Sequence, residues 1–398
     1  MTMRVLYLTH RVPYPPDKGD RIRNYHVLRQ LARRGRVWLA CLADEPTTPA
    51  IEAELGQLCE RVAIVPVSRG RWLRAGLSLL SGRSISEGAF AERGLRTAIR
   101  DWSKETKFGA AVVSASSLAP YLRVPELADV PKIVDLVDVD SQKWHDYADA
   151  SHGPKRWLYR LEASRVRKLE RELPKWTRAV AMVSRAEAEV FDSFAGAGTA
   201  TVAANGVDLE YFHLAAGLPA VDKTAGKPVA IFVGAMDYRP NVDAVVWFAR
   251  EMWPTIRAKW PEAEFRIVGR KPSPEVQRLA ELPGVKVLGG VPDVRPFVAE
   301  ASVVVAPMRL GRGIQNKVLE AMAMGKAVIV APPALAALKA EPGVHLLAAT
   351  TPQEWVEAVC GLFANPDRCR ELGAAAREFV DAHHHWETCL EPLMAKIF

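Results

Sequence analysis

The sequence predicts an α/β protein of two doubly wound, Rossmann-like domains that face a cleft. Short apolar segments rich in β-branched residues alternate with segments of helical periodicity along both halves of the chain. Between the halves, residues 213–228 combine glycine, proline and small residues, which is typical of a linker. Alternating strands and helices build parallel sheets covered by helices on both faces, and ligands bind such sheets at the carboxyl ends of the strands.

Composition narrows the class of protein. The 398 residues suffice for about two or three domains, and no apolar run approaches the ~18 residues that span a bilayer. The net charge of +7 favours anionic partners such as nucleotides, phosphates or an acidic membrane face. Nucleic acid is not expected, because no basic platform with interleaved aromatic residues occurs. The scattered cysteines, without CxxC pairs, indicate a reducing cytoplasm, and no metal site is expected.

The first domain is expected to span residues 1–204. Its strands are predicted at residues 4–9, 36–42, 62–67, 110–114, 132–139 and 179–184, the last of these closing the domain. A loop carrying Lys18, Gly19 and Asp20 precedes a helix predicted from about residue 22, so we expect this loop to face a ligand. It contains no GxGxxG pattern, so a dinucleotide site is not supported.

Three acids lie at the carboxyl end of the strand predicted at 132–139, namely Asp135, Asp138 and Asp140. Charged residues at this edge of a parallel strand usually point into the ligand crevice. The alternative is that they cap the following helix, and for Asp140 both interpretations stay open.

Two basic stretches of the first domain contain tryptophan. Residues 69–83 place Trp72 and several leucines among four arginines, and Trp157 lies between Arg156 and Arg160. One interpretation is helices that cover the sheet and leave their arginines in solvent. The other is an interfacial surface attracted to anionic lipids.

The second domain is expected to span residues 205–380, followed by a C-terminal helix over 381–398 that packs back on the first domain. Strands are predicted at residues 229–233, 264–268, 285–288, 303–306 and 327–331. Gly234 and Gly269 each follow a strand, where bare backbone can approach a ligand.

The stretch from Val303 to Pro333 predicts strand, glycine loop, helix and strand. Gly311 and Gly313 form the loop, and the helix starts near residue 315. A helix N-terminus favours a phosphate, and Lys317 adds a full charge there. Glu320, on the same helix face, can accept hydrogen bonds from sugar hydroxyls. The alternative is a plain βαβ unit with a Lys–Glu pair on its helix.

Five segments together carry a resemblance to a known family. They are NGVDLEYF (205–212), VGAMDYRPNVDAV (233–245), FRIVGR (265–270), GVKVLGGVPDVRP (284–296) and the GRGIQNKVLEAMAMGKAVIV segment that begins at Gly311. In this order they resemble the retaining GT-B-fold glycosyltransferases of family 4, particularly the bacterial exopolysaccharide sugar transferases of the exosortase-associated type. The resemblance covers essentially the whole chain.

The resemblance implies a UDP- or GDP-sugar donor on the second domain and an acceptor on the first, without cofactor or metal. Glu320 matches the glutamate that binds the donor ribose, and the backbone near Val291 would pair with the base. The amides of the loop with Gly311, Arg312 and Gly313 would meet sugar and phosphate. On the acceptor side we assign the glycine-bearing loop with Lys18, Gly19 and Asp20, together with Asn24.

Charged positions of the family pattern are replaced in this chain. The first motif glutamate is Arg312, the usual phosphate-binding arginine is Ala235, and a lysine five residues later is Pro240. We infer that Arg239 and Lys317 supply the missing charge and stabilise the leaving diphosphate. Where the family often has His-Asp, this chain has Val137-Asp138, and Asp138 is the candidate that orients or deprotonates the acceptor hydroxyl.

We therefore expect a cytoplasmic, membrane-peripheral, hexosyl-type glycosyltransferase that extends a polysaccharide or a lipid-linked saccharide. Two alternatives remain. An NDP-sugar 2-epimerase on the same fold would turn over the donor without acceptor. A catalytically silent subunit of a polysaccharide assembly complex would bind nucleotide without transfer, and the replaced charges favour it.

Overall fold

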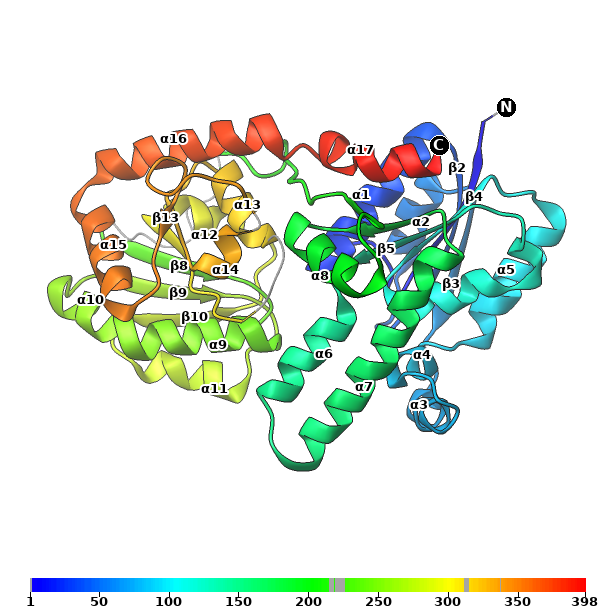
Figure 1. The fold of residues 1–398 in the computed structure, drawn as a ribbon. Helices are drawn as coiled ribbons and strands as arrows, with labels where there is room; N and C mark the ends of the chain where they lie inside the picture. The colour runs from blue at the N-terminus through cyan, green and yellow to red at the C-terminus, as the bar shows by residue number, and fades with distance from the viewer. Residues whose placement is uncertain (1, 215–217, 219–225, 311–314, 337) are drawn as a thin grey trace. The chain divides into compact units, whose positions relative to one another are not determined.

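The computed structural model describes residues 2–214, 218, 226–310, 315–336 and 338–398. The chain divides into two compact units, one of Met1–Ala204 with Leu390–Phe398 and one of Asn205–Cys389. Each unit is built on one parallel sheet with crossover helices (Figure 1), which confirms the predicted fold class.

The first unit has a seven-stranded parallel sheet in the order β3-β2-β1-β4-β5-β6-β7. Its strands are β1 Arg4–Thr9, β2 Arg36–Ala43, β3 Arg61–Pro66, β4 Ala110–Ser114, β5 Lys132–Val137, β6 Ala179–Met182 and β7 Ala200–Val202. The prediction that residues 179–184 form the last strand was wrong, because β7 pairs with β6 at the edge. β7 is three residues long and not fully buried, so it gives no apolar run that sequence could reveal.

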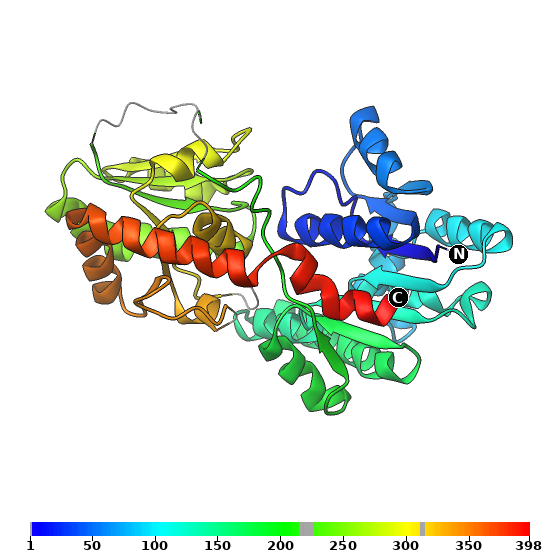
Figure 2. The same ribbon diagram turned by 90° about the horizontal axis from the view of Figure 1, so that it is seen from above.

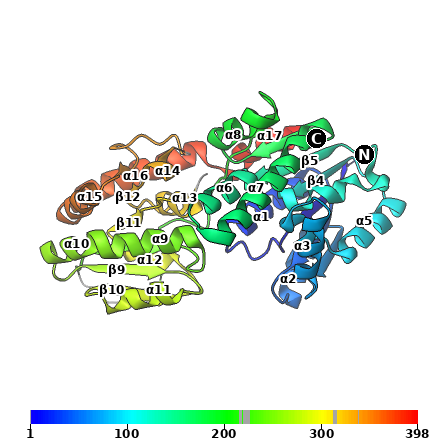
Figure 3. The ribbon, with the colours of Figure 1, turned by 60° about the horizontal axis from the view of Figure 1, so that its bottom comes forward.

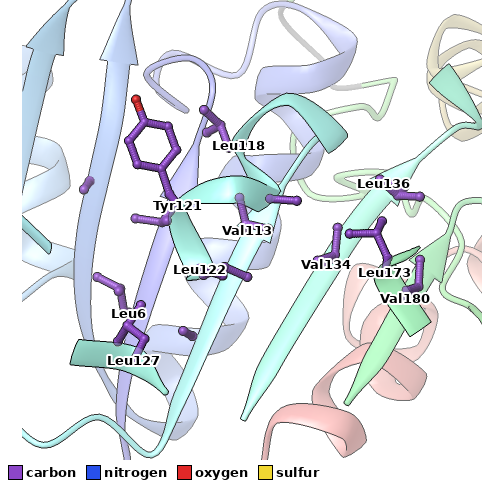
Figure 4. Close-up of a cluster of buried hydrophobic side chains, with 14 of the residues drawn as sticks. Leu6, Val113, Leu118, Tyr121, Leu122, Leu127, Val134, Leu136, Leu173 and Val180 are labelled. Carbon is purple, nitrogen blue, oxygen red and sulfur yellow. The ribbon is translucent and has the colours of Figure 1, made fainter. Parts of the chain in front are cut away.

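Helices cover both faces of this sheet. They are α1 Gly19–Arg34, α2 Pro49–Leu58, α3 Arg71–Leu80, α4 Ile85–Ala89, α5 Arg93–Glu105, α6 Asp140–Asp149, α7 Gly153–Glu172 and α8 Arg185–Ala195. Alternate strand residues, such as Leu6, Val113 and Val134, point to one face and pack there against Leu122 and Leu173 (Figure 4). The intervening residues therefore point to the other face, against which α1 packs.

The second unit has a six-stranded parallel sheet in the order β10-β9-β8-β11-β12-β13. Its strands are β8 Val229–Val233, β9 Glu264–Val268, β10 Val285–Gly289, β11 Val303–Ala306, β12 Val328–Val330 and β13 Leu347–Ala348. The helices are α9 Arg239–Trp247, α10 Trp253–Lys259, α11 Pro274–Gln277, α12 Arg295–Glu300, α13 Asn316–Ala323, α14 Pro332–Leu335, α15 Pro352–Ala364 and α16 Pro366–His383. A π-type turn, Phe248–Met252, separates α9 from α10.

Helix α16 runs along the second unit and packs on α13 (Figure 2). The chain breaks at His384 and resumes as α17, Trp386–Ile397, so residues 381–398 do not form one helix. The last residues, Leu390–Phe398, belong to the first unit. There Glu391 forms an ion pair with Arg34 of α1.

Candidate active site

The start of α13 is bonded to the start of α9 inside the second unit. Lys317 donates from Nζ to Oδ1 of Asn241 and to Oε1 of Gln315, both at 3.1 Å. Its ammonium also lies 5.4 Å from the centroid of the Phe232 ring. Asn241 is buried and donates from Nδ2 to the carbonyl of Ala235 at 2.9 Å. Asn241 thus fixes the turn after β8 and the Lys317 ammonium together.

Lys317 and Glu320 have opposite pKa shifts with one cause. Burial lowers the pKa of Lys317 to about 8, and the charge of Glu320 opposes that change. Burial raises the pKa of Glu320 to about 7, and the charge of Lys317 opposes that change. Among the described residues, the Glu320 carboxylate has no hydrogen-bond or ion-pair partner. The helix therefore presents a buried cation held by neighbouring acceptors and, three residues on, a carboxylate without such a partner.

Two glycines and one residue with unbonded backbone groups follow three neighbouring strands of the same sheet. Gly234 follows β8 and Gly269 follows β9, and a Cβ on Gly269 would lie 1.6 Å from the Gly234 carbonyl oxygen. Only glycine fits at position 269, because the contact between such a Cβ and the Gly234 oxygen is far shorter than the van der Waals distance. Val291 follows β10, and its backbone N–H and C=O make no hydrogen bond within the described residues. These groups are open to a ligand at this edge.

The other residues predicted for this site are one arginine of α9 and a loop that lies outside the described residues. Arg239 is the first residue of α9 and is exposed. Gly311, Arg312 and Gly313 lie outside the described residues. Asn241 was not predicted, because asparagine near a helix start resembles an ordinary capping residue and only the structure shows its bond to Lys317.

Asp138 follows a strained turn at the end of β5 in the first unit. Val137 has a φ of +69°, and the pairing register of β5 with β6 shifts at this point. A β-branched residue rarely adopts positive φ, and such strain concentrates at functional sites. Burial, and next the charge of Glu187, raise the pKa of Asp138 to about 7. Its carboxylate has no hydrogen-bond partner among the described residues.

The two acids beside Asp138 have structural partners. Asp135 is fully buried and accepts from Nε and Nη2 of Arg23 at 2.8 and 2.9 Å. The expectation that it points into a crevice was wrong, because alternation along β5 turns it toward α1. Asp140 begins α6 and accepts a hydrogen bond from Ser116 Oγ.

The β1–α1 loop is held by a network of charges. Lys18 pairs with Glu45 at 3.1 Å, and Asp20 contacts His10 at 3.2 Å and Arg11 at 3.0 Å. Burial alone would raise the pKa of Asp20, but its hydrogen bond with His10 and the nearby charges hold that pKa well below the usual range. Gly19 begins α1.

Asn24 lies on the buried side of α1. Its Oδ1 accepts from the Tyr7 hydroxyl at 3.1 Å, whereas its Nδ2 has no partner within the described residues. The helix predicted from about residue 22 thus begins at Gly19, with Lys18 just before it and Asp20 in its first turn. Asn24 lies one turn further along α1, against β1.

The family comparison matches a segment of the second unit that contains Lys317. Residues 227–365 match the family described as "Glycosyl transferases group 1". This part of the second unit is therefore similar to a glycosyltransferase domain, and the protein is an enzyme of that class. No relative was found among curated proteins.

Several solved structures share this fold over nearly the whole chain. HepE (Alr3699) of Anabaena in complex with UDP is 16% identical, covers 99% of both chains and has a TM-score of 0.68. A sucrose-phosphate synthase from Thermosynechococcus elongatus is 16% identical, covers 98% of this chain and 97% of its own, and has a TM-score of 0.67. WaaG, a glycosyltransferase involved in lipopolysaccharide biosynthesis, is 15% identical, covers 98% of both chains and has a TM-score of 0.66. At these identities the likeness shows the GT-B fold.

Neither a membrane-spanning helix nor a metal-binding cluster occurs among the described residues. No helix there is long and apolar enough to cross a membrane. No group of three or more His, Cys, Asp or Glu residues in the same part of the chain is arranged to hold a metal ion.

Proposed function

We propose that the protein transfers a sugar, with retention of configuration, from a UDP-sugar to a saccharide or lipid-linked saccharide in exopolysaccharide assembly of the exosortase-associated type. We place this work at the cytoplasmic face of the membrane, with the acceptor on residues 1–204 and the donor on residues 205–380. The observation that carries the proposal is the Lys317–Glu320 pair at the start of α13, inside a matched glycosyltransferase domain. Support for uridine comes from HepE, which was solved with UDP and with UDP-glucose.

In this proposal the start of α13 binds the donor diphosphate and ribose. The Lys317 ammonium is already held by Asn241, so it meets a phosphate oxygen without first being ordered. The unpaired Glu320 carboxylate accepts hydrogen bonds from the ribose hydroxyls. Gly234 and Gly269 allow close approach of the donor, and the Val291 backbone pairs with the base. Arg239 and the loop residues Gly311, Arg312 and Gly313 add charge and amides to the phosphate side.

Catalysis then rests on stabilising the leaving diphosphate. As the bond between the anomeric carbon and the phosphate oxygen breaks, negative charge grows on the diphosphate beside Lys317. The acceptor oxygen bonds to the anomeric carbon from the same face, and its proton passes either to the departing phosphate oxygen or to Asp138. Asp138 orients the acceptor hydroxyl or takes its proton, for which a pKa of about 7 suits it. No protein nucleophile is needed for retention in this scheme.

A thermal-shift panel of nucleotide sugars, followed by assays of nucleotide release, tests the proposal. A ligand at 100 times its Kd stabilises the folded state by about 2.7 kcal/mol, so the correct base and sugar should stand out. UDP release that depends on an added saccharide acceptor supports transfer. Conversion of the donor sugar without acceptor would indicate the 2-epimerase instead.

The silent-subunit alternative has one observation in its favour. Ala235 and Pro240 stand where the family has charged residues, and Arg312 replaces its first motif glutamate. That alternative predicts saturable nucleotide binding with neither release nor transfer for every acceptor tried. Lys317 argues for an active enzyme, because this chain keeps one cation at the start of α13, where we propose that the diphosphate binds.

A further inference from the structure

Helix α3 exposes its large apolar side chains and buries small ones. Trp72, Leu73, Leu77 and Leu80 are 66%, 71%, 56% and 86% exposed. On a helical projection, Leu73, Leu77 and Leu80 form one face, with Trp72 at its edge. The opposite face buries Ala75 and Ser78. An ordinary surface helix has the reverse arrangement, so the apolar face of α3 needs a partner.

The inner face of α3 is firmly attached, so the outward orientation is a property of the fold. A Cβ on Gly88 of α4 would lie 2.5 Å from the Arg74 carbonyl oxygen and from Ser78 Cβ, which shows how closely α4 packs there. Arg74 donates a hydrogen bond to Ser68 and forms an ion pair with Glu92, which lies just before α5. Rotating α3 to bury its leucines would break these contacts.

A second aromatic element lies on the same side of the unit. Glu162 of α7 accepts from the backbone N–H of Ile85 and of Ser86, at 2.6 and 2.9 Å, and so holds α4 against α7. Trp157 of α7 is 65% exposed and lies about one and a half helical turns before Glu162. Figures 1 and 3 show α3 and the turn that joins α6 to α7 projecting from this same side of the first unit.

Arginines predominate around this surface, although Asp149 pairs with Arg156 and Arg160. Arg69 precedes α3, Arg83 follows it, and Arg71 begins it with its guanidinium 4.8 Å from the centroid of the Trp72 ring. None of the three forms an ion pair with any described residue. Lys155 and Arg156 lie beside Trp157 and are exposed. The nearby acids are engaged elsewhere, since Glu162 bonds the α4 backbone and Glu87 closes the capping box of α4.

We infer that α3 lies flat in the interface of an anionic bilayer, with Leu73, Leu77, Leu80 and Trp72 inserted among the acyl chains and Arg69, Arg71 and Arg83 at the phosphates. Apolar residues on one side, arginines at the rim and an exposed tryptophan are the features of an interfacial helix. A protein partner would meet the same leucines, but three arginines without an ion-pair partner among the described residues fit a uniformly anionic surface better. This inference deepens the membrane location proposed above and names the docking surface.

The test is binding to vesicles of phosphatidylcholine with and without phosphatidylglycerol, measured by co-sedimentation. The wild type should bind the anionic vesicles more tightly, and added salt should weaken that binding. The variant Leu73→Ser/Leu77→Ser should lower the vesicle partition coefficient about tenfold or more, because two inserted side chains are lost. The matched control Leu288→Ser/Val344→Ser removes two exposed apolar residues of the second unit and should leave binding unchanged.

The charge is tested by a second pair of variants. Arg69→Gln/Arg71→Gln should lose most of the preference for anionic vesicles, whereas Arg61→Gln/Arg100→Gln removes the same charge elsewhere and should keep it. Equal vesicle binding by Leu73→Ser/Leu77→Ser and wild type would overturn the inference. So would a wild-type dimer that this variant dissociates without any vesicle binding, because α3 would then join two copies.

Failure of the inference and failure of the proposed function are separable. All exposed-residue variants are titrated with UDP in the absence of lipid, where they should match wild type. If wild type binds vesicles through α3 but binds no nucleotide, the membrane surface stands and the transfer reaction does not.

Discussion

Lys317 donates a hydrogen bond to Asn241 across 3.1 Å, joining the first turn of α13 to the first turn of α9. Two helix N-termini of the second unit are thereby tied at one point, next to the bare backbone of Gly234 and Gly269. Lys317 sits at the positive end of its own helix, where a cation is disfavoured. An anion bound beside it relieves that cost, which is why we assign it to the donor diphosphate.

Removing the Lys317 charge should weaken diphosphate binding. Lys317→Met keeps the length of the side chain and removes a charge-assisted contact, so the affinity for UDP should fall by roughly 10- to 100-fold. Calorimetric titration measures the change. Lys326→Met is the matched control, because Lys326 is also partly buried in the second unit but donates to the carbonyl of Ala299. Equal losses in both variants would mean that the effect is on the fold and that Lys317 is not a phosphate ligand.

The pH dependence of transfer should report Asp138. Its pKa of about 7 means that the carboxylate, the form able to accept a proton, predominates only above neutrality. We expect kcat/KM to rise with pH through about 7 and then level off. Asp138→Asn should lower the rate about 100-fold or more and lose this limb of the profile. Asp140→Asn is the control and should keep the limb; an unchanged profile in Asp138→Asn would remove Asp138 from the reaction.

The ion pair of Arg23 and Asp135 should matter to stability and to little else. Arg23→Met leaves a fully buried carboxylate without its partner, which should lower the free energy of unfolding by about 3–5 kcal/mol. Hydrogen exchange of the β5 amides in the first unit measures the loss. The double variant Arg23→Met/Asp135→Leu removes both charges and should recover most of it. A double variant as unstable as the single one would contradict a simple charge-burial origin.

Sequence reasoning brought together the parts of the proposed donor site that lie close together in the chain. Lys317 and Glu320 share one short helix, so their common face followed from helical spacing. Asn241 was missed because its partner is 76 residues away. Asp135 was misassigned because Arg23, 112 residues distant, is what identifies it as structural. Pairings at such separation are set by the order of strands in the sheet, which local patterns do not encode.

The sheets were predicted better at their centres than at their edges. Central strands carry continuous apolar runs, whereas β7 and β13 are short, incompletely buried edge strands. For α3, periodicity gave an amphipathic helix but not its orientation. Whether its leucines face the sheet or solvent depends on how α4 attaches, and only the structure shows that contact.

Arg312 is the replaced family position whose role is most open to test. A guanidinium only donates hydrogen bonds, so it suits the diphosphate or the carboxylate of an acidic sugar. We predict that Arg312→Ala weakens free UDP binding and that Arg312→Lys restores part of it. Weakened binding of a uronic-acid donor alone would instead assign Arg312 to the sugar carboxylate. If neither affinity changes, Arg312 is outside the site.

The buried Glu320 carboxylate should lower the free energy of unfolding of the protein without donor, and the bound donor should offset that loss. Its pKa is about 7 in the fold against 4.5 ordinarily, so folding favours the protonated carboxyl. Its contribution to stability is full below about pH 4.5 and is lost as the pH rises through about 7. Above pH 7, Glu320→Gln should therefore raise the free energy of unfolding on the order of 1 kcal/mol. A destabilised variant at pH 8, measured by urea unfolding, would show that the carboxylate is a structural group.

Calorimetric titration of UDP and UDP-glucose into wild type and Glu320→Gln tests the central claim most directly. The account predicts saturable binding to wild type and roughly 10- to 100-fold weaker binding to the variant, from loss of charge-assisted bonds to the ribose. A matched titration with 2′,3′-dideoxy-UDP should bind both proteins with the same weak affinity. Equal UDP affinity in wild type and Glu320→Gln would contradict the donor site described for α13.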